Sequence, residues 1–130
     1  MGNKTLAYAP VDLQDHLQRL EERNLLQKIH RKIDKNSELH PLVRWQFQGG
    51  IPAEKRKAFL FDNVTDASGK TFDMPVVVGA LAASPEIYAT GLGVEVEEIG
   101  DVWNRAMVNP IEPVTVDNAP CQQVVMTGAN

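Results

Sequence analysis

Cysteine and long apolar runs are scarce in this sequence of 130 residues. The single cysteine, Cys121, excludes an intrachain disulfide and fits a reducing compartment, where we expect it to be a small buried residue. The sequence contains no run of 18 apolar residues and no apolar signal-peptide segment near its start. These absences predict a soluble, cytoplasmic protein without a membrane partner.

Positive charge is limited as well. The 13 Lys and Arg residues are outnumbered by 17 Asp and Glu, which gives a formal net charge of −4. Binding to a nucleic-acid backbone requires basic side chains gathered on one face. The two basic runs, 28–32 and 55–57, are short and bordered by apolar or acidic residues. We therefore expect no nucleic-acid partner.

Residues that commonly carry catalysis are few and isolated. The three histidines, His16, His30 and His40, pair with no other His or Cys at a metal-ligand spacing. Cys121 has no basic or helix-start setting that would favour a thiolate, and phosphate-loop, nucleophile-elbow and zinc patterns are absent. The residues therefore predict no catalytic, no cofactor-binding and no metal-binding position in this chain.

Two other patterns resemble sites but have structural interpretations. The acidic cluster of Glu95, Glu97, Glu98 and Asp101 could help to bind a cation, but acids at these positions also favour the start of a helix. Residues 91–93, Gly-Leu-Gly, contain two glycines of a dinucleotide fingerprint. They follow a predicted helix and lack the third glycine, so we interpret them as a turn.

Four helices are predicted from apolar residues at helical spacing and from start and stop signals. Asp12, Ser37 and Ser84 are suitable N-caps for the first three. Asn24 can end the first, because Asn tolerates the left-handed conformation. The predicted helices cover residues 12–24, 37–50, 84–93 and 97–107.

About five strands are predicted from β-branched and alternating apolar residues. They cover residues 25–33, 58–61, 75–78, 114–116 and 123–126. Residues 1–11 lack periodicity and are predicted to form an extended N-terminal arm. The fold class is therefore α+β, a single compact domain with about five strands in a mixed sheet and about four helices packed on it.

The order of these segments resembles the N-terminal domain of UbiD-family prenylated-FMN-dependent decarboxylases. Residues 12–21 are similar to the family's first helix, and residues 24–29 to its first strand. Ala-Phe-Leu-Phe-Asp-Asn-Val at 58–64 and Met-Pro-Val-Val-Val-Gly-Ala-Leu at 74–81 are similar to the next two strands. The resemblance covers residues 12–130. Within it, residues 110–130 resemble the segment that leads into a flavin-binding domain missing from this chain.

This resemblance implies a longer enzyme, a carboxy-lyase. Such an enzyme catalyses reversible non-oxidative decarboxylation of an aromatic, heteroaromatic or α,β-unsaturated acid. It uses prenylated FMN, a divalent metal such as manganese, and potassium, and a homo-oligomer is expected. The family's metal ligands, cofactor-contacting Arg and acid-base Glu all lie beyond residue 130. This chain is therefore expected to pack and assemble rather than catalyse, with exposed apolar residues at its end: Val114, Val116, Val124 and Met126.

Two alternatives remain open. The chain can be a small non-catalytic subunit that completes a separate catalytic chain, because this predicts the same contact surface. It can also be a self-sufficient enzyme that uses His40 and the acidic cluster. A stoichiometric partner would favour the first alternative, and loss of activity in a His40→Ala variant would favour the second.

Overall fold

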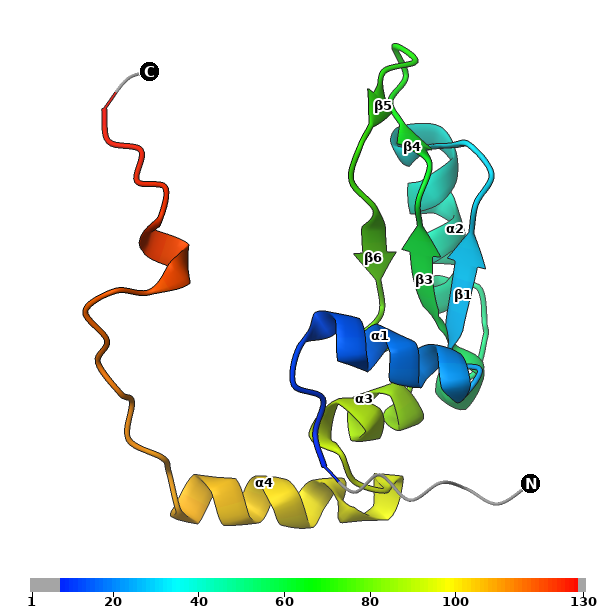
Figure 1. Cartoon of the computed structure of the whole chain (residues 1–130). Coiled ribbons are helices and arrows are strands. Elements are labelled where there is room, and N and C mark those ends of the chain that lie inside the picture. The colour runs from blue at the N-terminus through cyan, green and yellow to red at the C-terminus, as the bar shows by residue number, and fades with distance from the viewer. Residues whose placement is uncertain (1–7, 129–130) are drawn as a thin grey trace.

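Six short strands form two three-stranded ladders in residues 8–128, the part of the chain described by the computed structural model. In the first ladder, β1 (Leu26–Ile29) pairs in parallel with β3 (Ala58–Phe61), which pairs antiparallel with β6 (Val76–Val78). In the second, β2 (Ile33–Asp34), β4 (Val64–Thr65) and β5 (Thr71–Phe72) repeat this pattern. The two ladders therefore continue each other along the same three segments of chain (Figure 1).

Four α-helices accompany these strands. They are α1 (Leu13–Glu22), α2 (His40–Gln48), α3 (Pro85–Leu92) and α4 (Ile99–Val108). In Figure 1, α2 lies behind the sheet, α1 and α3 lie across one end of it, and α4 runs away from the body below them. The described residues thus form an α+β domain, which confirms the predicted fold class.

The core lies on both faces of β3, because successive side chains of a strand point in opposite directions. Ala58 belongs to a cluster that packs under α1 and α3, together with Leu17, Leu20 and Ile87. A second cluster faces α2 and contains the two Phe side chains of the strand, along with Ile33, Leu39 and Val64. As a result, β3 divides the mostly aliphatic core into two layers. Residues 58–61 were predicted to form this strand.

Local signals set the limits of α1 and α3 as predicted. The Asp12 carboxylate accepts from the backbone N–H of Asp15 at 2.8 Å, and Asn24 has a φ of 58° just after the helix. The Ser84 hydroxyl accepts from the Ile87 N–H at 3.2 Å. Gly93 ends α3 in the left-handed conformation. These signals are readable because each acts within three or four residues of its helix end.

The second helix begins differently from its prediction. Asp34, and not Ser37, is the N-cap, because its carboxylate accepts from the N–H groups of both Asn36 and Ser37 at 2.8 Å. One π-helical turn, Lys35–Leu39, follows and leads into α2. The Asp34 carboxylate satisfies two backbone N–H donors, whereas a Ser37 hydroxyl would satisfy one, so Asp34 is the better N-cap. The predicted stop at residues 49–50 is confirmed, since Gly49 is the C-cap.

Several predicted strands were wrong or incomplete. Residues 25–33 are divided between β1 and β2, and the two-residue strands β4 and β5 were not predicted. Residues 114–116 and 123–126 form no strand at all. Their β-branched side chains favour extended backbone, but a strand also needs a neighbour for its hydrogen bonds, and neither segment has one in the described structure.

The described residues near the two ends of the chain form little regular structure. Residues 8–11, the described part of the predicted N-terminal arm, are irregular, and residues 1–7 and 129–130 lie outside the described residues. Cys121 is exposed, so its prediction as a buried residue was wrong. It lies within a short 3-10 turn, Pro120–Gln122, in a segment that reaches no core.

Candidate interaction surface

The end of the described chain carries an unusually apolar and exposed surface. Every residue from Trp103 to Gly128 is exposed except Ala119, which is half-buried. In Figure 1 this segment, orange to red after α4, runs beside the body of the domain rather than into it. We call its large apolar side chains the C-terminal surface: Trp103, Met107, Val108, Ile111, Val114, Val116, Val124, Val125 and Met126.

The predicted exposure of Val114, Val116, Val124 and Met126 is confirmed, because all four side chains are exposed. Exposed apolar side chains gathered in one segment often mark a contact site, and the nine of the C-terminal surface all lie within residues 103–126. The C-terminal surface is therefore the strongest candidate for a contact site in the described residues.

The helix in this surface is supported mainly at its start. Glu95 and Glu98 form a capping box at the 3-10 turn Val96–Glu98 that leads into α4, in which the Glu98 carboxylate accepts from the Glu95 N–H at 2.9 Å. The acidic cluster therefore begins a helix, as interpreted from the sequence. Further along, the Trp103 indole N–H donates to the Tyr88 hydroxyl at 2.7 Å. This bond connects α4 to α3, while no residue of α4 is buried.

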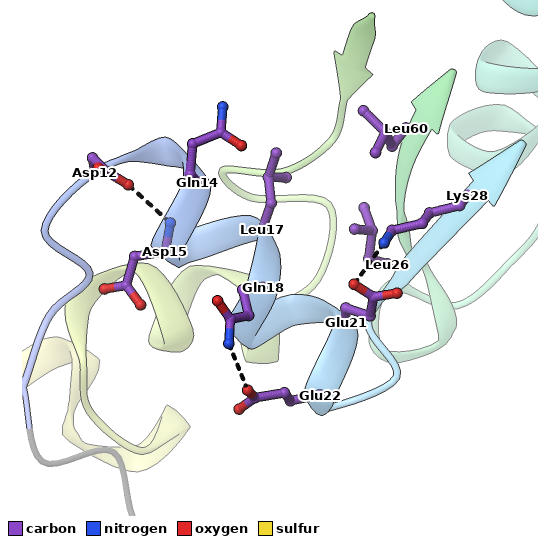
Figure 2. A pocket seen from close by; sticks show the side chains of 10 residues that line it. All are labelled: Asp12, Gln14, Asp15, Leu17, Gln18, Glu21, Glu22, Leu26, Lys28 and Leu60. Carbon is purple, nitrogen blue, oxygen red and sulfur yellow. Dashed lines mark hydrogen bonds and ion pairs between the residues drawn. The ribbon is translucent and has the colours of Figure 1, made fainter. Parts of the chain in front are cut away.

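An open groove of about 810 Å³ lies beside α1, where the helix crosses the sheet (Figure 2). Leu17, Leu26 and Leu60 provide its apolar part. Its polar lining is mainly acidic: Asp12, Asp15, Glu21 and Glu22, with the amides of Gln14 and Gln18. Lys28 is the single cation in this lining, and it donates to Glu21 at 2.6 Å.

This lining does not fit a flavin mononucleotide. The phosphate of such a cofactor needs free cations or backbone N–H donors, as at a helix start. In the groove the one ammonium group is already paired with a carboxylate, and the remaining acids would repel an anion. We therefore derive no cofactor chemistry from this groove.

The three histidines lie in separate places. His16 is buried in α1, and its Nε2 donates to the Ala80 carbonyl at 2.6 Å. His30 follows β1 and pairs with Asp62 at 2.5 Å on the surface. His40 is exposed at the first position of α2, at the other end of the domain from the acidic cluster (Figure 1). The structure thus does not bring together the two parts of the self-sufficient active site considered above.

The acids of the described residues act in local hydrogen bonding. Within residues 8–128, no group of three or more His, Cys, Asp or Glu side chains could hold a metal ion. Hydrogen bonds from Arg19 and the Val11 N–H lower the pKa of Asp15, and the Ser37 and Asn36 N–H groups lower that of Asp34. The pKa of Glu38 is lowered by the Asp34 N–H and by Arg31, and that of Asp66 by Ser68 and the Lys70 N–H. These carboxylates stabilise turns and helix starts.

Residues 17–107 match the family model of the 3-octaprenyl-4-hydroxybenzoate carboxy-lyase N-terminal domain. The chain belongs to this UbiD N-terminal domain family. The match begins within α1 and ends within α4, so it includes all six strands and all of α2 and α3. This agrees with the resemblance seen in the order of the sequence segments. Residues 108–128, which hold most of the C-terminal surface, lie beyond the matched part.

Sequence reasoning missed the buried polar residues of this UbiD N-terminal domain. A charged side chain such as Arg19 is expected on the exposed side of a helix, but it is buried and bonded to Asp15 and Tyr8. Gln46 is buried as well, and it exchanges two hydrogen bonds with the backbone of Lys57. The Asp15-to-Arg19 spacing of four residues was the one signal in the sequence that could have revealed this contact, since such pairs meet on a helix.

No helix in the described part of the chain is both long and apolar enough to span a bilayer.

Proposed function

We propose that this chain is the N-terminal portion of a UbiD-type carboxy-lyase and that it packs on, and helps to assemble, the flavin-binding part of that enzyme. The observation that carries the proposal is the C-terminal surface, which begins near the end of the family match and lies mostly beyond its last residue, 107. Burial of apolar area is the main favourable term in protein association, and Trp side chains are frequent anchors of such contacts. Trp103 would be the central anchor.

The reaction of the assembled enzyme belongs to the same proposal. It is the reversible, non-oxidative decarboxylation of an aromatic, heteroaromatic or α,β-unsaturated acid in the cytoplasm. Prenylated FMN, with manganese and potassium, would supply an electron sink for loss of the carboxyl group. We assign these groups to the flavin-binding part, since the acidic groove of this chain does not fit a flavin phosphate. A homo-oligomer of the full enzyme is part of this proposal.

A small assembly subunit remains the second candidate, because the same surface serves either arrangement. The experiment that separates them is purification of the protein from its native cells under its own promoter, followed by intact mass and flavin analysis. A chain well above 14.4 kDa that contains a flavin-binding part supports the first proposal. A chain of 14.4 kDa with a stoichiometric flavin-binding partner supports the subunit. Carboxy-lyase activity from an unpartnered chain of that mass would overturn both.

A further inference from the structure

Residues 8–11 cross the turn that connects α3 to the start of α4. Gly93, which ends α3 with a φ of 70°, lies so close to this crossing that a Cβ atom there would collide with the backbone of Tyr8 and Ala9. In Figure 1 the segment before α1 runs past α3 toward α4. We call residues 8–11 the strap.

Arg19 and Asp15 fasten the strap to α1. The Arg19 guanidinium donates to the Tyr8 carbonyl at 2.6 Å and lies 4.3 Å from the centroid of the Tyr8 ring. Its other nitrogens donate to the two oxygens of Asp15 at 3.0 and 2.8 Å. Asp15 in turn accepts from the Val11 N–H at 3.0 Å. Arg19 is only 9% exposed and Asp15 is half-buried, so this bidentate pair is partly shielded from solvent.

The position of the strap matters because α4 has little other support. No residue of α4 is buried, and its hydrogen bond to α3 runs through one pair, Trp103 and Tyr88. A helix of 10 residues is marginal on its own in water, so its direction depends on the turn from which it starts. That turn follows Gly93, directly beneath the strap.

We propose that the strap is a conformational device: by holding the turn after α3, it fixes the direction in which α4 presents Trp103 and Met107. Release of the strap frees α4 from the body without unfolding the two core clusters. The importance of the direction of α4 for assembly rests on the function proposed above. The effect of the strap on α4 does not depend on that function, so it can be measured in this chain alone.

The test compares two glycine substitutions by hydrogen exchange of individual backbone amides. Gly93→Ala and Gly69→Ala both place a side chain at positive φ, 70° and 82°, so their conformational costs are similar. Position 69 is in open space, whereas position 93 lies under the strap. We expect exchange in residues 99–108 to become about tenfold faster in Gly93→Ala and to stay unchanged in Gly69→Ala.

A second pair of variants protects the test against misfolding of Gly93→Ala. Arg19→Gln removes the fastening of the strap, while Arg31→Gln removes an exposed ion pair with Glu38 and is the control. Exchange at Val11 reports directly on release of the strap, and slow exchange in β3 shows that the core persists. Faster exchange at Val11 together with faster exchange in α4 supports the proposal. Faster exchange at Val11 with α4 unchanged overturns it, whatever the outcome of the assembly experiments.

Discussion

At the scale of single residues, His16 shows how burial decides which polar groups matter. Its imidazole is 5% exposed, Nε2 donates to the Ala80 carbonyl, and Nδ1 finds no hydrogen-bond partner in the described structure. The hydrogen bond joins α1 to the segment after β6, 64 residues away. A buried polar group with one good bond stabilises a fold through that bond.

We expect His16→Ala to lower the free energy of unfolding by about 2 kcal/mol, because the Ala80 carbonyl loses its donor and a cavity remains. The control is His40→Ala, which removes an exposed ring from the start of α2 and should cost no more than about 0.5 kcal/mol. Urea unfolding followed by circular dichroism measures both. Equal losses in the two variants would contradict the role assigned to His16.

The four carboxylates with lowered pKa values predict how stability depends on pH. In the unfolded chain Asp15, Asp34, Glu38 and Asp66 recover pKa values near 4, so the unfolded state binds more protons. Their contribution is fully present above that value and is lost as the pH falls through the lower, folded pKa values. We therefore expect the melting temperature to be level between about pH 5 and 7 and to decline below about pH 4.

The Asp66→Asn variant tests this assignment at one turn. It should flatten part of the decline at acid pH, because an amide does not titrate while it can still accept from Ser68 and Lys70. Thermal unfolding between pH 3 and 7 is the measurement. An unchanged acid slope would show that Asp66 does not contribute.

At the scale of secondary-structure elements, α2 is joined to the sheet by apolar packing and by one buried amide. Gln46 accepts from the Lys57 N–H at 2.9 Å and donates to the Lys57 carbonyl at 2.8 Å, just before β3 begins. Together these bonds satisfy the two backbone groups of Lys57, as a neighbouring strand would. The amide thus fixes the position of α2 against β3.

We expect Gln46→Ala to destabilise the domain by about 2–3 kcal/mol, since both backbone groups of Lys57 would lose their partners in a partly buried place. The matched control is Gln48→Ala, two residues later on the exposed side of the same helix. Chemical unfolding measures the difference. If Gln46→Ala and Gln48→Ala proved equally stable, α2 would have to be held by its apolar contacts alone.

At the scale of the whole molecule, the domain buries its core residues but leaves the apolar side chains of the C-terminal surface exposed. Two apolar clusters are buried between the helices and the sheet, yet apolar side chains from α4 onward remain in water. Association that buries such side chains recovers about 25 cal/mol per Å² of apolar area, before the entropy cost of binding.

A pair of methionine variants tests the surface in the purified native assembly. Met107→Asp places a charge on the C-terminal surface, and Met74→Asp places one outside it. The two methionines are similarly exposed, Met107 at 76% and Met74 at 70%. We expect Met107→Asp to weaken assembly about tenfold or more, because a charge is costly to bury in an apolar contact, and Met74→Asp to have less than about a twofold effect. Where the flavin-binding part is a separate chain, dilution-dependent sedimentation measures the contact, and where it belongs to the same longer chain, the free energy of unfolding measures it. Comparable effects of both variants would place the contact elsewhere.

By itself, the sequence determined the features that act over a few residues. Asp12 and Ser84 cap their helices, Gly49 and Gly93 end theirs, and residues 58–61 form the central strand. These signals depend on hydrogen bonds or apolar alternation within one segment, so no distant partner is needed to read them. The order of such segments was also sufficient to place the chain in its family.

Only the tertiary structure decided the features that need a partner far away in the chain. Residues 114–116 have the β-branched composition of a strand but remain exposed, because no neighbouring strand supplies hydrogen bonds in the described structure. Conversely, the polar helix residues Arg19, Gln46 and His16 are buried, because backbone carbonyls 11 to 64 residues away accept their hydrogen bonds. The free energy of these contacts depends on which groups meet in space, and spacing along one segment does not contain that information.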